Sequence, residues 1–264
     1  MITSLTNAKI KTLVLLRTKA KVRNNERLMV AEGFRIFEEA PVKLIREIYI
    51  EENALMKLSP SAKAKVNECK ARGVFTETVS REVMLKASDT DSPQGIIFTL
   101  SQPHYSVKDI ISNVPPKDKG NILILENIQD PGNLGTMMRT AEAAGVSGVI
   151  LSKDCVDIFN PKTVRSTMGA LFRVPFVYSE DLKKDIETLK KNKVTIYAAA
   201  LDAKDDYDKI AYEGRSGILI GNEGNGLSKE MVDISDTHVI IPMSGQIESL
   251  NAAVAAALLL YRAK

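Results

Sequence analysis

Residues 133–141, NLGTMMRTA, combine a side-chain amide, a glycine and an arginine at spacings that could position a reacting group. Gly135 and Arg139 are four residues apart, so they share one face of the helix that the pattern predicts to end near Gly145. A glycine lets another group approach the backbone, and a guanidinium one turn away can bind an anionic oxygen. The segment is also compatible with a helix that is capped by Asn133 or Thr136 and carries a solvent-exposed arginine.

A second segment, GNEGNGL at 221–227, places the carboxylate of Glu223 inside a glycine-rich turn. Such turns, which lead from a strand into a helix, can surround a phosphate. This one lacks both the P-loop ending and the G-x-G-x-x-G spacing of dinucleotide-binding folds. Because a carboxylate repels phosphate, the turn suits a hydroxyl, an amine or an arginine better. A tight turn with a helix cap is the alternative.

A third segment, IPMSGQIESLN at 241–251, is a polar loop between an apolar strand and a helix rich in alanine and leucine. Buried backbone needs hydrogen-bond partners, so a polar loop between two buried elements indicates a ligand that supplies them. Ser249 and Asn251 are its candidate polar contacts. A helix cap at Ser249 is the simpler alternative.

The elements that carry these segments predict an α/β fold. Continuous apolar runs at 121–127, 148–152, 194–202, 217–222 and 238–243 are typical of parallel strands that helices cover on both faces. Between them, residues 160–172 read as a helix with Asn160 as N-cap and Pro161 in its first position. Ligands of open α/β sheets bind beyond the carboxyl ends of the strands, where all three polar segments lie.

The first half of the chain predicts a smaller α/β domain. Apolar runs at 27–33, 44–50, 73–79 and 95–100 alternate with helical patterns, which indicates a largely parallel sheet. Two prolines, a glycine and charged residues at 113–121 read as a linker. We therefore expect one domain over residues 1–113, a linker over 114–120 and a second domain over 121–264.

The composition excludes several classes of protein. No apolar stretch is long enough to span a bilayer, and no apolar core near the N-terminus resembles a secretory signal. Cys69 and Cys155 are far apart and predict reduced thiols in a cytoplasmic protein. Two histidines, His104 and His238, are too few and too separated for a metal site, so we expect none.

The N-terminal segment is strongly basic although the whole chain has a net charge of only +3. Residues 1–27 carry seven lysines and arginines against a single glutamate. A solvated basic helix explains this pattern, and so does a contact with nucleic-acid phosphates. Under the second interpretation, the candidate phosphate contacts include Lys19, Lys21 and Arg23.

The three polar segments together resemble the SpoU (TrmH-like) family of RNA ribose 2′-O-methyltransferases, within the SPOUT superfamily. The family motif N-x-G-x-x-x-R-x-A is similar to residues 133–141, G-N-E-x-x-G-L to 221–227, and I-P-M-x-G-x-x-x-S-L-N-x-x-x-A to 241–255. The resemblance covers roughly residues 121–262. Alanines follow Asn251 where many relatives have polar or β-branched residues, which puts the packing at a subunit contact in doubt.

This resemblance implies a fold and a reaction. The fold would be an α/β-knot domain, in which the C-terminal segments form a deep trefoil knot around S-adenosylmethionine, with a mostly parallel sheet. The reaction would be methyl transfer to a ribose 2′-hydroxyl of RNA. The family proposal gives the removal of the hydroxyl proton to the arginine that matches Arg139. Because a guanidinium normally keeps its charge, the other role for Arg139 is to fix the ribose phosphate and stabilise negative charge on oxygen. The family implies catalytic residues Arg139, Asn133, Glu223, Ser249 and Asn251, of which the last four would hold Arg139 and the ribose in place. It implies cofactor-binding residues Leu219, Ile220, Gly221, Ile241, Met243 and Leu250.

The first half looks like the family's RNA-recognition domain, which resembles ribosomal proteins of the kink-turn type. Its segment VAEGFRIFEEA is similar to the subgroup that acts on large-subunit ribosomal RNA, thiostrepton-resistance enzymes included. Arg165 matches a position that the family often keeps basic, which implies a contact with the RNA; a charge on a helix surface is the alternative. The resemblance also implies a homodimer through the knot domains. A non-catalytic RNA-binding paralogue or assembly factor is the alternative, and a base-methylating relative or a nucleotide-dependent oxidoreductase fits the motifs less well.

Overall fold

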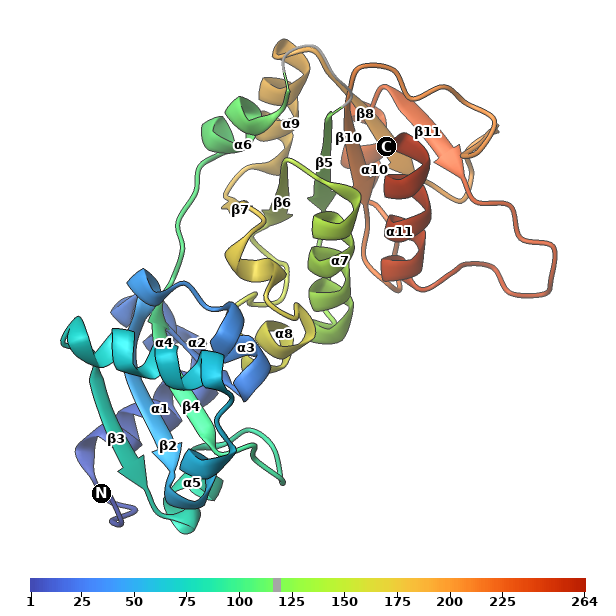
Figure 1. The fold of residues 1–264 in the computed structure, drawn as a ribbon. Helices are drawn as coiled ribbons and strands as arrows, with labels where there is room; N and C mark the ends of the chain where they lie inside the picture. The colour runs from blue at the N-terminus through green and yellow to red at the C-terminus, as the bar shows by residue number, and fades with distance from the viewer. Residues whose placement is uncertain (116–119) are drawn as a thin grey trace. The chain divides into compact units, whose positions relative to one another are not determined.

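The computed structural model describes residues 1–115 and 120–264, which divide into two compact units. The first unit, unit 1, consists of residues 1–103 and 157–172. The second, unit 2, consists of residues 104–156 and 173–264. Each is described by itself (Figure 1).

Unit 1 is built on a four-stranded sheet in the order β1-β4-β2-β3. Strand β4 runs antiparallel to both β1 and β2, and only β2 and β3 are parallel. The expected largely parallel sheet is therefore wrong for this half, because alternation of strands and helices does not reveal the direction in which β4 enters the sheet. The elements of unit 1 are α1 (Ala8–Thr18), α2 (Ala20–Glu26), β1 (Leu28–Glu32), α3 (Phe34–Glu39), η1 (Val42–Leu44), β2 (Ile45–Glu51), η2 (Glu52–Lys57), α4 (Pro60–Ala71), β3 (Phe75–Val79), α5 (Arg81–Ala87), β4 (Ile96–Ser101), α8 (Pro161–Ser166) and η3 (Ala170–Phe172).

Helices cover both faces of this sheet. On one face, Leu13 and Leu16 of α1 pack with Ile97 of β4 in a buried cluster. On the other face, the rings of Phe37 in α3 and Phe98 in β4 meet edge to face, with centroids 5.1 Å apart. Successive residues of β4 thus point to opposite layers, as the two-residue period of a strand requires. The sheet is the centre of a three-layer unit.

The segment 157–172 belongs to unit 1, although in sequence it lies between two strands of unit 2. As expected, its helix α8 has Asn160 as N-cap, whose side chain accepts a hydrogen bond from Lys162 N, and Pro161 in the first turn. The helix contains six residues and contacts β1.

Unit 2 contains a seven-stranded sheet in the order β7-β6-β5-β10-β8-β11-β9, in which every pair is parallel. This confirms the expected mostly parallel sheet. Two strands, β7 and the two-residue β9, were not expected from the sequence. The elements of unit 2 are α6 (Val107–Asn113), β5 (Gly120–Leu125), α7 (Pro131–Ala144), β6 (Gly148–Ser152), β7 (Phe176–Ser179), α9 (Leu182–Lys191), β8 (Val194–Ala199), β9 (Asp205–Asp206), β10 (Arg215–Ile220), α10 (Lys229–Ile234), β11 (Thr237–Ile240) and α11 (Ala252–Ala263).

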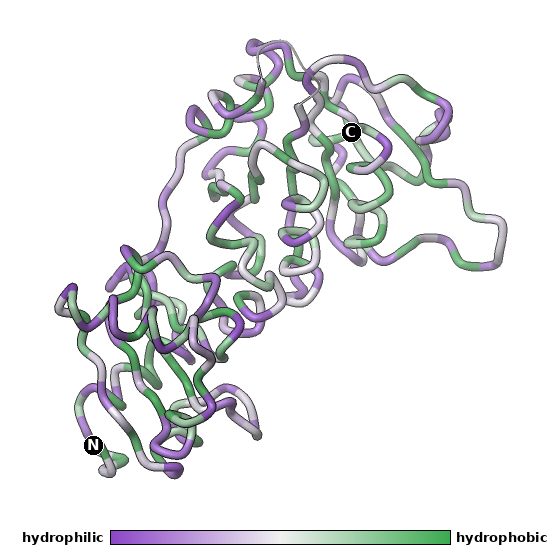
Figure 2. Tube along the Cα trace, viewed as in Figure 1, coloured by the Kyte–Doolittle hydropathy of each residue, from purple (hydrophilic) through white to green (hydrophobic). Residues whose placement is uncertain are grey.

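The central strands of unit 2 are mostly apolar (Figure 2), which is typical of strands that helices cover on both faces. Residues 122–125 of β5 are all fully buried. One face packs in a cluster with α6, α9 and α10, and α11 contacts β10, β5 and α7. Each fully buried aliphatic side chain contributes about 1.5–3 kcal/mol.

The boundary between the units falls earlier than the sequence predicted. Helix α6 was expected in the first domain, but its Ile110 packs in the core of unit 2 and lies against Gly148 of β6. The change of unit therefore comes between Pro103 and His104. Residues 116–119 of the predicted linker lie outside the described residues.

Two further expectations concern the whole fold. The trefoil knot stays a prediction, although the packing of α11 against α7 and β10 is compatible with it. Among the described helices, none is both long enough and apolar enough to cross a membrane.

Candidate functional site

The three polar segments lie at the carboxyl ends of β5, β10 and β11 in unit 2 (Figure 1). Strands β5 and β10 are neighbours, and β8 separates β10 from β11. All run parallel, so their carboxyl ends meet at one edge of the sheet. The fold thus brings together segments that are up to about 120 residues apart in sequence.

The segment after β5 starts helix α7 with Asp130 as N-cap. Its Oδ1 accepts a hydrogen bond from Asn133 N at 2.7 Å, and Pro131 occupies the first turn. The expected cap at Asn133 or Thr136 is therefore wrong, because Asp130 sits before a proline that fits the first helical turn. The expected end near Gly145 is confirmed. With the cap supplied by Asp130, the side chain of Asn133 is available for other contacts.

The segment after β10 is a closed turn. Asn222 N donates to Gly226 O at 3.0 Å, and Gly226 N donates to Asn222 O at 2.9 Å. A Cβ atom on Gly221 would lie 2.3 Å from backbone atoms of Gly226 and Leu227, so only glycine fits there. Gly226 has a φ of +68°, a left-handed conformation that also favours glycine. The two glycines fix the place of Glu223 between them.

The carboxylate of Glu223 accepts hydrogen bonds from three groups of the segment after β5. Oε1 accepts from Asn133 Nδ2 at 3.0 Å and from Asp130 N at 3.1 Å, and Oε2 accepts from Gln129 N at 3.1 Å. Partial burial favours the neutral acid, but these hydrogen bonds outweigh it and hold the pKa of Glu223 below its ordinary value. The carboxylate is therefore an anion that fastens two motif segments together.

The segment before α11 joins the same network through Asn251. Its Oδ1 caps α11 by accepting from Ala253 N at 2.8 Å, and its Nδ2 donates to Asn133 Oδ1 at 2.9 Å. The cap is thus Asn251 and not Ser249. Asn133 lies between the carboxylate of Glu223 and the amide of Asn251, so one continuous chain of hydrogen bonds connects the three segments.

A supporting turn, residues 152–156, holds the backbone that binds Glu223. Asn127 adopts a φ of 56°, which is uncommon for a residue other than glycine. Its N–H donates to Ser152 Oγ at 2.9 Å, and the N–H of Ile128 donates to Cys155 Sγ at 3.3 Å. The side chain of Gln129 donates to Asp154 O at 2.7 Å. Sequence analysis missed this turn because its residues carry no motif, and buried Cys155 was read only as a free thiol.

A cavity of about 210 Å³ lies beside this network and matches most of the predicted cofactor residues. Ile220, Gly221, Ile241, Met243 and Leu250 line it, together with Glu223 and Ser249. Leu219 does not: it is fully buried and packs in the core cluster with α9 and α10, because neighbouring residues of a strand face opposite sides.

The sequence analysis missed one wall of the cavity. Ala199 ends β8, and Ala200 and Leu201 follow it; β8 lies next to β10 in the sheet. The apolar run that ends in AAALD could have signalled this wall, since small side chains at the carboxyl end of a neighbouring strand leave room for a ligand.

Two predicted catalytic residues lie apart from the hydrogen-bond network. Ser249 is exposed, as are residues 244–248, and it makes no hydrogen bond with any described residue. Arg139 is exposed on α7, whereas Gly135 is buried. Within the described part of the chain, Arg139 has no hydrogen-bond or ion-pair partner and does not line the cavity. The expected contacts of Arg139 with Asn133, Glu223, Ser249 and Asn251 are therefore not present.

The predicted RNA contacts all lie in unit 1, but they differ in how exposed they are and in whether they are already paired. Lys19 and Lys21 are exposed. Arg23 is only 3% exposed and binds Asp157 through Nε at 2.9 Å and Nη2 at 2.5 Å. A buried guanidinium that is already paired cannot meet a phosphate, so Arg23 is removed from the RNA contacts. Arg165 is partly exposed and pairs with Asp89 at 2.9 Å.

The arrangement suits a flat base and a positioned hydroxyl better than a metal ion. Apolar side chains wall a cavity at a sheet edge, and one anionic carboxylate is committed to holding amides in place. Across residues 1–115 and 120–264, no group of three histidine, cysteine or acidic side chains could hold a metal ion.

Comparison with known proteins adds to this geometry. The family model described as "SpoU rRNA Methylase family" matches residues 120–261, and an "MRM3-like substrate binding domain" model matches residues 7–97. The chain is 31% identical over 262 residues to the Bacillus subtilis 23S rRNA (guanosine(2553)-2′-O)-methyltransferase RlmP, covering 98% of this chain and 97% of that protein.

Solved structures are similar over nearly the whole chain. An AdoMet-bound rRNA methyltransferase from Sinorhizobium meliloti superposes with a TM-score of 0.87 at 30% identity, over 99% of this chain and 96% of that one. The SpoU methyltransferase AviRb from Streptomyces viridochromogenes, in complex with AdoMet, shares the fold with a TM-score of 0.83 at 24% identity, over 97% of each chain.

Proposed function

Because the chain belongs to the SpoU rRNA methylase family, we propose that it transfers a methyl group from S-adenosylmethionine to a ribose 2′-hydroxyl of RNA. The observation that carries this proposal is the hydrogen-bond chain Glu223–Asn133–Asn251, which joins the three family motifs beside an apolar cavity. Methyl transfer needs mainly the correct placement of two reactants, which a rigid network provides.

The cavity residues fit S-adenosylmethionine. Ile220, Met243 and Leu250 offer apolar surfaces to an adenine ring, and the exposed backbone of the 241–250 loop offers hydrogen-bonding groups to its edge. When bound, the cofactor supplies a methyl group on a positively charged sulfur. The similar S. meliloti structure holds AdoMet, which supports the same choice here.

We assign to Arg139 the task of binding the ribose phosphate and stabilising the charge that develops on the attacking oxygen. It is exposed and, in the described residues, has no internal partner that an RNA would need to displace. A guanidinium keeps its charge at physiological pH, so it acts as a fixed cation and not as the proton acceptor. Ser249, also exposed and at the cavity, would contact the ribose.

The RNA substrate is proposed to be large-subunit ribosomal RNA, and the chain to act in the cytoplasm. Full-length similarity to a 23S rRNA methyltransferase supports this choice, as does the match of unit 1 to a substrate-binding domain. Exposed Lys19 and Lys21, together with Arg165, would contact phosphates. The nucleotide to be methylated would be selected by unit 1.

We further propose a homodimer through unit 2. Val254 and Tyr261 of α11 are seven residues apart, so they share a helix face, and they are 48% and 55% exposed. Nearby in sequence, Ile247 of the open loop is 61% exposed. A second copy of the chain would cover this apolar face.

Light scattering should give twice the mass of one chain, and a Val254→Glu variant should be a monomer. A wild-type monomer with full activity would contradict the dimer.

Transfer of a labelled methyl group to ribosomal RNA tests the proposed activity. We expect incorporation that depends on S-adenosylmethionine and maps to one ribose 2′-oxygen. Calorimetric titration with S-adenosylmethionine distinguishes the enzyme from the alternative, a non-catalytic RNA-binding factor. RNA binding without any affinity for S-adenosylmethionine would establish that alternative and exclude the enzyme.

A further inference from the structure

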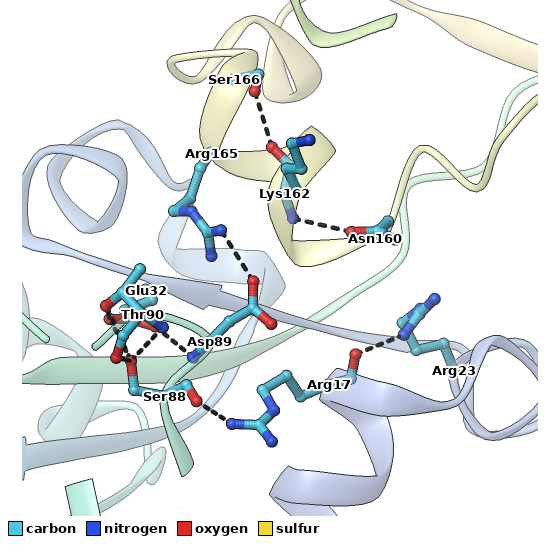
Figure 3. Close-up of polar contacts among 10 residues, drawn as sticks. All are labelled: Arg17, Arg23, Glu32, Ser88, Asp89, Thr90, Asn160, Lys162, Arg165 and Ser166. Carbon is cyan, nitrogen blue, oxygen red and sulfur yellow. Dashed lines mark hydrogen bonds and ion pairs between the residues drawn. The ribbon is translucent and has the colours of Figure 1, made fainter. Parts of the chain in front are cut away.

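An ion pair in unit 1 links α8 to the loop that follows α5. Arg165 Nη2 lies 2.9 Å from Asp89 Oδ2, and the two side chains are 31% and 39% exposed (Figure 3). The partners are 76 residues apart in sequence. An exposed pair of this kind contributes little to the free energy of unfolding. Both partners are nevertheless held in place by further contacts.

The segment that carries Arg165 is held in place by a buried arginine, Arg23. Arg23 binds Asp157, at the start of the 157–172 segment, and its Nη1 donates to Leu16 O at 2.8 Å and to Arg17 O at 3.0 Å. Thr163, on the buried side of α8, has no exposed surface. Arg23 is therefore a positioning residue, which fixes the segment that carries Arg165.

The Asp89 side is fixed as well. Glu32 accepts hydrogen bonds from Ser88 Oγ at 2.7 Å, Asp89 N at 3.2 Å and Thr90 Oγ1 at 2.7 Å. Arg17 donates to the backbone carbonyl of Ser88 from the opposite side (Figure 3). The backbone of Asp89 is thus held at both sides, and its carboxylate cannot move far from Arg165.

The guanidinium of Arg165 is only partly satisfied by this arrangement. Its Nη1 is enclosed and has no hydrogen-bond partner among the described residues, and the same holds for Nε of Arg17. A guanidinium binds carboxylate and phosphate oxygens in the same forked geometry. Asp89 binds Nη2, and a phosphate oxygen could take its place there.

We propose that Asp89 sets the affinity of unit 1 for RNA by occupying, in the free protein, the place on Arg165 that a backbone phosphate takes in the complex. The inference rests on the proposed function, since it takes RNA as the partner. Exchange of one oxyanion for another keeps Arg165 paired throughout, and exposed Lys162, one turn earlier on α8, adds positive charge for the phosphate. Asp89 then weakens binding to any RNA that does not place a phosphate at this point.

Affinity for a ribosomal RNA fragment, measured with the full chain as a function of salt, tests the proposal. Asp89→Asn removes the competing anion and should tighten binding by about two- to fivefold. Arg165→Ala removes the phosphate contact and should weaken binding by about tenfold, with a salt slope smaller by about 0.7–0.9. In the double variant, the gain from Asp89→Asn should disappear, because no freed guanidinium remains.

The chain offers a matched control pair. Arg72 and Glu68 form an exposed ion pair at 2.9 Å on α4, so Glu68→Gln makes the same charge change elsewhere on unit 1. This variant should leave RNA affinity unchanged. Thermal unfolding of each variant should match the wild type within a few degrees, and Arg165→Lys should restore part of the affinity.

The outcomes separate this inference from the proposed function. An equal gain from Asp89→Asn with and without Arg165, or an equal gain from Glu68→Gln, indicates a general charge effect and overturns the proposal. Unchanged affinity in Asp89→Asn or Arg165→Ala overturns it too, while methylation by the wild type would still stand. Absence of RNA binding and methylation in the wild type would instead reject the proposed function.

Discussion

The groups at the candidate site differ sharply in how firmly the fold holds them. Glu223, Asn133 and Asn251 are joined by hydrogen bonds that connect three motif segments. Arg139 and Ser249 belong to the same motifs, yet both are exposed and have no partner in the described residues. The first set forms a fixed framework, and the second set is exposed to solvent.

This difference teaches that a motif residue can serve the reaction in two ways. A framework residue acts through other groups, so its removal should damage both the stability of the fold and the reaction. Under the proposed function a free residue acts on the substrate, so its removal should damage the reaction alone. Activity and stability, measured on the same variants, distinguish the two sets.

The largest effect is expected for Arg139→Ala. Loss of a cation that stabilises developing negative charge typically lowers the rate by about 100- to 1000-fold. Because Arg139 has no internal partner in the described chain, thermal stability and affinity for S-adenosylmethionine should remain close to the wild type. Single-turnover methylation, calorimetry and thermal unfolding measure the three quantities. A variant with most of its turnover would remove Arg139 from the reaction.

A smaller loss of activity, accompanied by a loss of stability, is expected for Glu223→Gln. The amide keeps one oxygen and replaces the other by an NH2 group. Its N–H donors would therefore lie against either the N–H of Gln129 or the donors of Asp130 and Asn133. The free energy of unfolding should fall by about 1–3 kcal/mol, and the methylation rate by about tenfold or more. Chemical denaturation checks the first. Unchanged stability together with lost activity would place Glu223 among the free groups.

The 244–249 segment should become ordered when the cofactor binds. Its residues are exposed in the free chain, and Leu250 and Met243 at its ends line the cavity. Hydrogen exchange of these amides should slow in saturating S-adenosylmethionine, whereas the 221–226 turn, already closed by its own hydrogen bonds, should change little. Ligand at about 100 times its dissociation constant should add about 2.7 kcal/mol to stability. If the cofactor slowed exchange equally in both segments, the predicted difference between the open loop and the closed turn would be wrong.

The pH dependence of stability offers the finest test. The pKa of Glu223 is lowered in the folded chain, so its stabilising effect is present above the ordinary glutamate value. That contribution is lost as the pH falls through the lowered pKa. The stability difference between the wild type and Glu223→Gln should therefore shrink in acid. A constant difference from neutral to acid pH would show that the charge of Glu223 does not matter.

The sequence predicted much of unit 2 because its signals are local. Continuous apolar runs marked buried parallel strands, and the motif residues fell at strand ends, where the sheet rule places ligands. The hydrogen bonds within the site were less accessible. Asp130 and Asn251, and not Asn133 or Ser249, cap the helices, since competing cap residues stand within a few positions of each other and only tertiary contacts decide between them.

Unit 1 was harder to predict, for reasons that concern long-range contacts. The direction of β4 depends on how the loop before it crosses the unit, which no periodicity records. Burial of Arg23 depends on Asp157, 134 residues away. A basic side chain in a basic segment reads as a surface group, and only a partner brought in by the fold reveals that it is an internal anchor.

The assignment of residues 157–172 to unit 1 has a consequence for how such proteins diversify. Ile158, Val164 and Leu171 are fully buried there, although they are encoded between two strands of the methyltransferase sheet. An exchange of the N-terminal module alone, by recombination or by an engineer, would leave these side chains without their native packing. A working exchange of this module would therefore also have to carry residues 157–172.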